Sequence, residues 1–268
     1  MKTEFRIGRV LSVGARLWAR NLVPLVLLTA LAHAPLIIWG CAIAQGEPDH
    51  RQFFAIVSFE SLLYSLVIAA NGLAAGLVAP GLIKQLQGQR LTFLARIGRG
   101  LARAHAAFGT LLFAAIYFAV MCFIAAIPLT AARLPSAGAI CGILVGLYFY
   151  VRFYVAIPAS VIERPGPYEA LARSGDLSKG HRAAILGLLL VLIVGSAVLG
   201  GIVLATTGAI GRLAPSAPVP DLRPWLYIEL VRSVLVGSFV ATLPTVAYYF
   251  LRSEKQGTSP DELAVIFE

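Results

Sequence analysis

Charged residues are scarce in this chain of 268 residues. They make up 13% of it, whereas an ordinary soluble domain is about 25% charged, and apolar residues make up 59%. A soluble domain needs many more charged side chains on its surface, so this composition excludes one. The sequence is that of an integral membrane protein.

Motifs of catalytic and metal sites are also missing. The sequence has no H-E-x-x-H, G-x-x-x-x-G-K-[ST], G-x-S-x-G or S-x-x-K element, and its 13 Asp and Glu residues are dispersed. We therefore expect neither an enzyme nor a metal or cofactor site.

Cysteine is rare as well. Cys41, Cys122 and Cys141 lie in apolar surroundings without a C-x-x-C pair. They are interpreted as packing thiols, with a contact between Cys122 and Cys141 across one hairpin as the alternative.

Basic residues give the chain a net charge of +9, but they cluster in short stretches between long apolar runs. This distribution indicates membrane lipids with anionic headgroups as partners and argues against nucleic acid.

The fold class expected is an all-α membrane protein of a single domain, with six transmembrane helices arranged as three hairpins. A span needs about 20 apolar residues, and lipid leaves no partner for an open strand edge. Small residues at 30–34 resemble a secretory cleavage site, but apolar sequence continues past them, so we expect an uncleaved first span. The six runs lie near 22–43, 55–82, 106–130, 137–158, 183–210 and 225–250.

The distribution of Lys and Arg predicts the orientation. Seventeen of the 22 lie before the first span, between spans two and three, from the end of span four (Arg152) to the start of span five, or in the tail (251–268). Four lie in the other connections and Arg232 lies in a span. Both termini are therefore expected on the cytoplasmic side of the membrane.

Three of these basic segments are predicted to form amphipathic helices that lie in the headgroup plane. The first lies within 1–21, the second begins after Thr92, which caps it, and the third begins at Pro167. In the third, Glu169 and Arg173 stand at i,i+4. The arginines expected to contact lipid headgroups are Arg6, Arg9, Arg16, Arg20, Arg96, Arg99 and Arg103.

A leucine followed four residues later by Asn or His recurs just before three of the spans. The pairs are Leu17/Asn21, Leu101/His105 and Leu177/His181. We interpret it as three copies of one unit, an amphipathic helix followed by a hairpin; chance recurrence in a Leu-rich chain is the alternative. A capping box at Ser259, Pro260 and Glu262 predicts a short tail helix.

Glycines at every fourth position predict close helix packing, within the chain or between two copies. They are Gly72 and Gly76 in span two and Gly138, Gly142 and Gly146 in span four.

The candidate polar and charged residues at depth within the spans are His33, Glu60, Asn71, Glu229 and Arg232. We hypothesise that Arg232 pairs with Glu60 at a similar depth, with Glu229 as a second partner or solvated; both charges reaching water at the outer interface is the alternative. His33 and Asn71 are interpreted as interhelical hydrogen-bonding groups, or as part of a proton or substrate route.

Two stretches carry a resemblance, "AIPASVIERPGPYEALARSGDLSKGHR" (156–182) and "AYYFLRSEKQGTSPDELAVIFE" (247–268). They resemble the membrane domain of some bacterial glycerophosphodiester phosphodiesterases and related stand-alone inner-membrane proteins of unknown function. Phe250 and Gln256 stand where that pattern often has acidic residues. The catalytic barrel is absent, so its hydrolytic activity is not implied. The resemblance implies a six-helix membrane module, and with it a location in the bacterial inner membrane. The matching residues are Pro158, Glu163, Glu169, Ala170, Leu171, Arg173, Ser174, Leu177, Gly180, Tyr249, Leu251, Arg252 and Gly257.

The function expected is that of a non-enzymatic membrane module that engages anionic lipids or a membrane-protein partner. One alternative is a small transporter or lipid-handling protein with a cavity between hairpins, favoured by a polar cavity that reaches His33 and Asn71. The other is an accessory subunit of a larger membrane complex. The sequence does not specify an oligomeric state.

Overall fold

The computed structural model describes residues 5–45, 50–89, 91–212 and 223–256, of which 50–65, 135, 204 and 207–212 are described by their backbone alone. This part of the chain forms helices and no strand, as expected where lipid cannot satisfy an open sheet edge. The helices are α1 (Ile7–Arg20), α2 (Leu22–Ala44), α3 (His50–Leu86), α4 (Phe93–Ala102), α5 (Ala104–Ala131), α6 (Pro135–Arg152), α7 (Ala156–Glu163), α8 (Pro167–Ser178), α9 (Arg182–Arg212) and α10 (Arg223–Gln256).

The prediction of six spans is confirmed. Six helical segments are long and apolar enough to cross a bilayer. The chain is therefore a multi-pass, all-α membrane protein. The segments are Leu22–Ala44, Leu66–Leu86, Ala104–Ala131, Ser136–Glu163, Arg182–Val203 and Arg223–Gln256.

Span four is not one continuous helix, because its helix is interrupted between α6 and α7. The sequence predicts that the fourth apolar run ends near 158, but α6 already ends at Arg152, and Pro158 lies in the first turn of α7. The N–H groups of a first turn have no intrahelical partner, so a proline there removes no hydrogen bond. Arg164, with φ of 64°, ends α7 in the left-handed region, and Pro167 opens α8 as expected.

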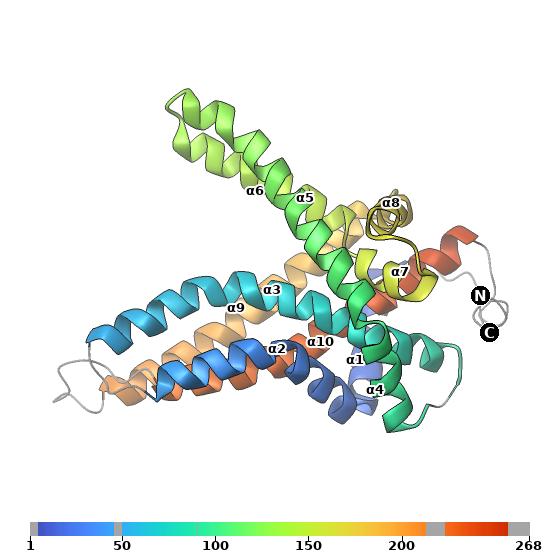
Figure 1. Ribbon diagram of the computed structural model, residues 1–268, viewed down its shortest axis with the longest axis horizontal. Coiled ribbons are helices and arrows are strands. Elements are labelled where there is room, and N and C mark those ends of the chain that lie inside the picture. The colour runs from blue at the N-terminus through green and yellow to red at the C-terminus, as the bar shows by residue number, and fades with distance from the viewer. Residues whose placement is uncertain (1–4, 46–49, 90, 213–222, 257–268) are drawn as a thin grey trace.

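Helix α10 is the centre of the bundle. It packs against α2, α3, α1 and α9. In its most apolar stretch of 18 residues, 78% of the residues are buried. The hairpin of α5 and α6 is the least buried by the same measure, since only 6% of the residues in the most apolar stretch of α5 are buried. In Figure 1 this hairpin, in green, diverges from α2, α3 and α10 and projects away from them.

Helices α1, α4, α7 and α8 gather at one end of the bundle, on the right of Figure 1, and we call this end the collar. Each of α1, α4 and α8 is followed by a hairpin of long helices, so the threefold layout expected from the sequence is present. The offset residues are not equivalent in detail, because Leu17 and Leu177 are buried whereas Leu101 is exposed. The two ends of the described chain meet at the collar, where the Phe5 N–H donates to Glu254 Oε2 at 2.8 Å.

Helix α1 was expected to lie in the headgroup plane with its apolar face toward lipid, but it packs against the protein instead. Its apolar face is buried against the protein, with Val10 at 0% exposure and Gly14 against the Leu243 side chain of α10. The Trp18 indole N–H donates to Ser238 Oγ at 2.7 Å, which fixes α1 on the same helix. The amphipathic pattern was identified correctly, but α1 turns its apolar side to α10 instead of lipid. The predicted tail helix at Ser259 lies outside the described residues.

Candidate functional site

Two of the charged residues predicted within the spans, Glu229 and Arg232, form an ion pair within α10. Arg232 Nε donates to Glu229 Oε2 at 2.7 Å, and a second contact joins the guanidinium to Oε1. Glu229 is 4% exposed and therefore not solvated. This i,i+3 pairing neutralises both groups at depth, where an isolated charge would be costly. The side chain of Glu60 lies outside the described residues, so its pairing with Arg232 stays a prediction.

His33 and Asn71 come together at Gly237 of α10. A Cβ on Gly237 would lie 2.5 Å from Asn71 Oδ1 and 3.4 Å from His33 Cε1, so a larger residue there would displace the end of the Asn71 side chain. His33 is fully buried, and its Nδ1 lies 2.9 Å from the Thr29 carbonyl oxygen one turn earlier. Among the described residues, neither His33 Nε2 nor Asn71 Oδ1 has a hydrogen-bond partner.

The glycine stripes lie against neighbouring helices of the same chain. Cβ atoms on Gly138 and Gly146 would lie 2.8 Å from Thr130 and Phe118 of α5, while Gly142 leaves ordinary contact distances. Gly72 and Gly76 approach α5 and Ile157 of α7 with similar closeness. The monomer-closing interpretation of these stripes therefore agrees with the packing of this chain.

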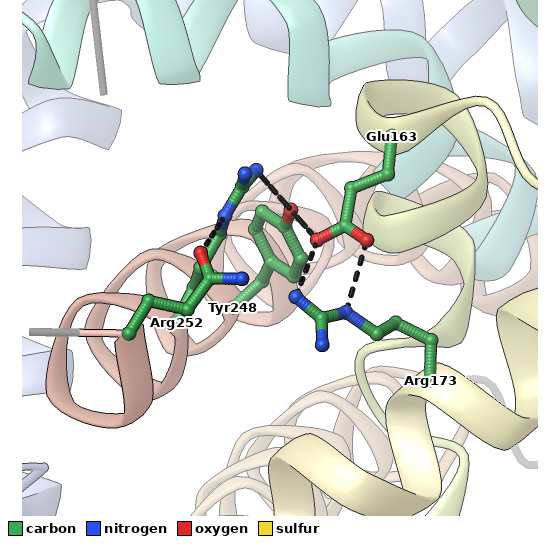
Figure 2. A network of polar contacts seen from close by, with 5 residues as sticks. Glu163, Arg173, Tyr248 and Arg252 are labelled. Carbon is green, nitrogen blue, oxygen red and sulfur yellow. Dashed lines mark hydrogen bonds and ion pairs between the residues drawn. The ribbon is translucent and has the colours of Figure 1, made fainter. Parts of the chain in front are cut away.

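A carboxylate at the collar joins three elements (Figure 2). Glu163, at the end of α7, accepts from Arg173 of α8 at 2.9 and 3.3 Å. Its Oε1 also accepts the Tyr248 hydroxyl of α10 at 2.6 Å. Arg252 donates to the Tyr248 hydroxyl at 2.8 Å and lies 3.6 Å from the same carboxylate. We call Glu163, Arg173, Tyr248 and Arg252 the Glu163 cluster.

The Glu163 cluster gives a physical role to residues of the resemblance. Glu163, Arg173 and Arg252 are far apart in sequence, yet they converge on one carboxylate. The expected i,i+4 contact of Glu169 with Arg173 is replaced, because Glu169 instead accepts the Gly166 N–H at the start of α8. Sequence reasoning missed Tyr248, although its i,i+4 spacing to Arg252 in a buried helix was a usable signal.

Helix α8 also caps the end of α6. The hydroxyls of Ser174 and Ser178 donate to the Arg152 carbonyl at 2.9 and 3.3 Å, which satisfies one of the orphan acceptors of a helix end. A Cβ on Gly175 would lie 2.9 Å from Arg152 Nε, so the two helices meet through small residues.

Helix α4 differs from α1 and α8 because its apolar residues face outward. Phe93, Leu94 and Leu101 are exposed, Leu94 at 79%, while Gly100 seats the helix against the Leu77 carbonyl of α3. The Thr92 hydroxyl accepts the Ala95 N–H and caps the helix as expected.

Arg96 corrects the expected set of lipid-facing arginines. Its guanidinium donates to Asn21 Oδ1, and its stem lies against Gly81, so it points into the protein. Asn21 in turn donates to Gln85 at 2.7 Å, so this buried amide connects α3, α4 and the junction of α1 with α2. The remaining arginines of the set are exposed or half-buried: Arg6, Arg9, Arg16, Arg20, Arg99 and Arg103.

The three cysteines are free and half-buried. The Cys122 thiol donates to the Gly142 carbonyl across the hairpin at 3.4 Å, so it serves helix packing.

A cavity of about 430 Å³ lies where the projecting hairpin meets the rest of the bundle. Its wall is formed by α3, α5, α6, α7, α9 and α10, and it includes Asn71, Tyr150 and Tyr154 but not His33. The wall contains no Asp, Glu, Lys, Arg or His, so the cavity is apolar with a few neutral polar groups. Its volume falls within the range of about 300–1,000 Å³ typical of ligand sites.

No family model, curated protein or solved structure matches this chain. The class of protein that the fold defines is a six-span helical membrane protein. The resemblance to the membrane domain of glycerophosphodiester phosphodiesterases stays a prediction.

Proposed function

We propose that this protein is a non-enzymatic module of the bacterial inner membrane, with both termini in the cytoplasm, that engages anionic lipid headgroups through its collar. The observation that carries the proposal is α4, a basic amphipathic helix whose apolar face is exposed. Such a helix lies with its apolar side among acyl chains and its cations beside phosphates.

The charge distribution supports the same orientation. Most Lys and Arg residues fall in the connections at the collar end, where an anionic leaflet attracts each with about 1 kcal/mol. Arg99 is exposed and Arg103 half-buried, whereas Arg96 is already bonded to Asn21. We therefore assign the lipid contact of this helix to Arg99 and Arg103 and a structural role to Arg96.

The test is the lipid content of the natively purified protein, measured by mass spectrometry. The double variant Arg99→Gln with Arg103→Gln should retain less phosphatidylglycerol and cardiolipin relative to phosphatidylethanolamine. Arg133→Gln is the matched control, because Arg133 is an exposed arginine in the connection between α5 and α6. Equal retention by all three proteins would overturn the proposal. A stoichiometric protein in the same preparation would instead favour an accessory subunit.

A second candidate function is lipid handling, and the cavity favours it. A polar cavity that reaches both His33 and Asn71 was expected for a small transporter or lipid-handling protein, and this expectation is met only at Asn71. The cavity reaches Asn71 alone and is walled mainly by apolar side chains. An apolar or amphipathic molecule therefore suits it better than a polar solute.

A further inference from the structure

We propose that the segment joining α7 to α8 is a second membrane contact of the collar, in which Tyr168 inserts into the glycerol and carbonyl layer of the bilayer. Such a contact goes beyond the headgroup binding of α4, because it needs no anionic lipid. It rests on the proposed function only for placing the collar at the membrane surface. Two observations carry it: the position of Tyr168 against a spanning helix and the way its backbone is held.

Tyr168 lies on the outer surface of the protein, beside a helix that spans the bilayer. It is 71% exposed, and its ring meets the ring of Phe113 of α5 edge-on, with centroids 6.4 Å apart. Pro167 lies against Gly109 of the same helix, 3.8 Å from the place of a Cβ there. Helix α8 therefore begins beside α5 at the collar (Figure 1).

The position of Phe113 determines the depth of this contact. Helix α5 has 28 residues and is about 42 Å long, whereas the hydrocarbon core is about 30 Å thick, so the core begins about 6 Å into the helix. Gly109 and Phe113 are about 8 and 14 Å from its start at Ala104. Leu112 and Ile116 are exposed beside them, as expected of a surface that faces lipid. Tyrosine is enriched in this layer, because its ring is apolar and its hydroxyl polar.

The backbone before Tyr168 is held so that the ring stays outside the protein. Pro167, whose φ is fixed by its ring, opens α8. Arg164 has φ of 64°, a left-handed conformation that the surrounding structure must maintain in a residue other than glycine. Glu163, the residue before it, accepts from Arg173 of α8 at 2.9 Å. A ring held in this way loses little conformational freedom when it enters the lipid.

The two lipid contacts of the collar differ in their chemistry. Arg99 and Arg103 of α4 attract anionic headgroups, and salt screens this attraction. The ring of Tyr168 is uncharged and is stabilised by leaving water. Insertion of Tyr168 should therefore depend on neither headgroup charge nor ionic strength.

The test is the tryptophan fluorescence of the variant Tyr168→Trp, as full-length protein in phosphatidylcholine vesicles. The acyl chains are brominated either at carbons 6 and 7 or at carbons 11 and 12, because bromine quenches nearby tryptophans. The wild-type protein, with Trp18, Trp39 and Trp225, supplies the background to subtract. Asp176→Trp is the matched control, because Asp176 is exposed on the same helix, with its carbonyl bonded to Lys255 at the end of α10.

We expect the fluorescence added by Tyr168→Trp to be quenched at least twofold more by bromines at carbons 6 and 7 than by the deeper ones. Acrylamide, a quencher in water, should act at least twofold less on Tyr168→Trp than on Asp176→Trp. Both results should be the same at low salt and at 1 M salt.

Bromine quenching no stronger in Tyr168→Trp than in Asp176→Trp would overturn the inference, and so would quenching that is lost at 1 M salt. Neither result bears on the binding of anionic lipid by α4, because phosphatidylcholine carries no net charge. Conversely, if Arg99→Gln with Arg103→Gln retains as much phosphatidylglycerol as the wild type, the proposed function fails while the expected quenching of Tyr168→Trp still supports the second contact.

Discussion

Replacing Glu163 with Gln tests whether the Glu163 cluster holds the collar together. The substitution keeps the shape of the side chain and an oxygen that can accept the Tyr248 hydroxyl, but it removes the negative charge. Arg252 is 7% exposed and lies 3.6 Å from that charge, so the substitution removes the carboxylate nearest to it among the described residues. The effect should therefore come from electrostatics and not from packing.

The magnitude follows from burial. Breaking a fully buried ion pair costs about 3–5 kcal/mol, and an exposed pair is worth about 0–1 kcal/mol. The Glu163 side chain is 19% exposed, and Arg252 keeps Tyr248 and Gln256 as partners, so we expect a loss of about 2–3 kcal/mol. Arg173→Gln, at a side chain that is 31% exposed, should cost about 0–1 kcal/mol.

The assay is reversible unfolding in mixed detergent micelles, titrated with a denaturing detergent and followed by circular dichroism. Glu169→Gln is the matched control, since Glu169 lies in the first turn of α8 and the amide oxygen of glutamine can still accept the Gly166 N–H. The reasoning is refuted if Glu163→Gln and Glu169→Gln lower the free energy of unfolding by the same amount.

Two further predictions concern the interior of the bundle. Gly237→Ala should lower the free energy of unfolding by about 1 kcal/mol, the low end of overpacking costs, because its Cβ would displace Asn71 Oδ1 at the end of a short side chain. Gly195→Ala, with open space at its Cβ, should not destabilise, and equal effects would contradict the close approach. Glu229→Gln should cost about 3–5 kcal/mol by leaving Arg232 without its i,i+3 carboxylate, unless Glu60 compensates. A double-mutant cycle of Glu60→Gln with Arg232→Gln, read by thermal unfolding, decides that point, and additive small losses would end the Glu60 hypothesis.

The sequence predicted the spans well because length and apolar composition determine which helices can cross a bilayer. It also located α1, α4 and α8, since a period of 3.6 residues is visible in any single helix. It could not tell which neighbour covers each apolar face. Val10 and Leu94 look alike in their patterns, yet Val10 packs into the protein and Leu94 faces outward.

In the candidate sites too, features visible in one helix were predicted, whereas contacts between distant parts of the chain were not. The close packing of Gly138 and Gly146 against a helix was predicted from their spacing, because small residues at every fourth position form one face, but the spacing did not identify α5 as that helix. Arg96 was misassigned, because its inward partner, Asn21, lies 75 residues earlier and no local pattern links them. The cavity was equally out of reach, since its wall combines residues of six helices.

The most direct measurement of the central claim is the lipid composition retained by the wild-type protein as ionic strength rises. The protein would be reconstituted with equal amounts of phosphatidylglycerol and phosphatidylethanolamine, extracted in mild detergent, and its bound lipids counted by mass spectrometry. Headgroup binding by exposed arginines predicts enrichment of phosphatidylglycerol at low salt that falls toward the input ratio near 1 M salt, where screening acts within about 3 Å. Retention at the input ratio under every salt condition would contradict the account.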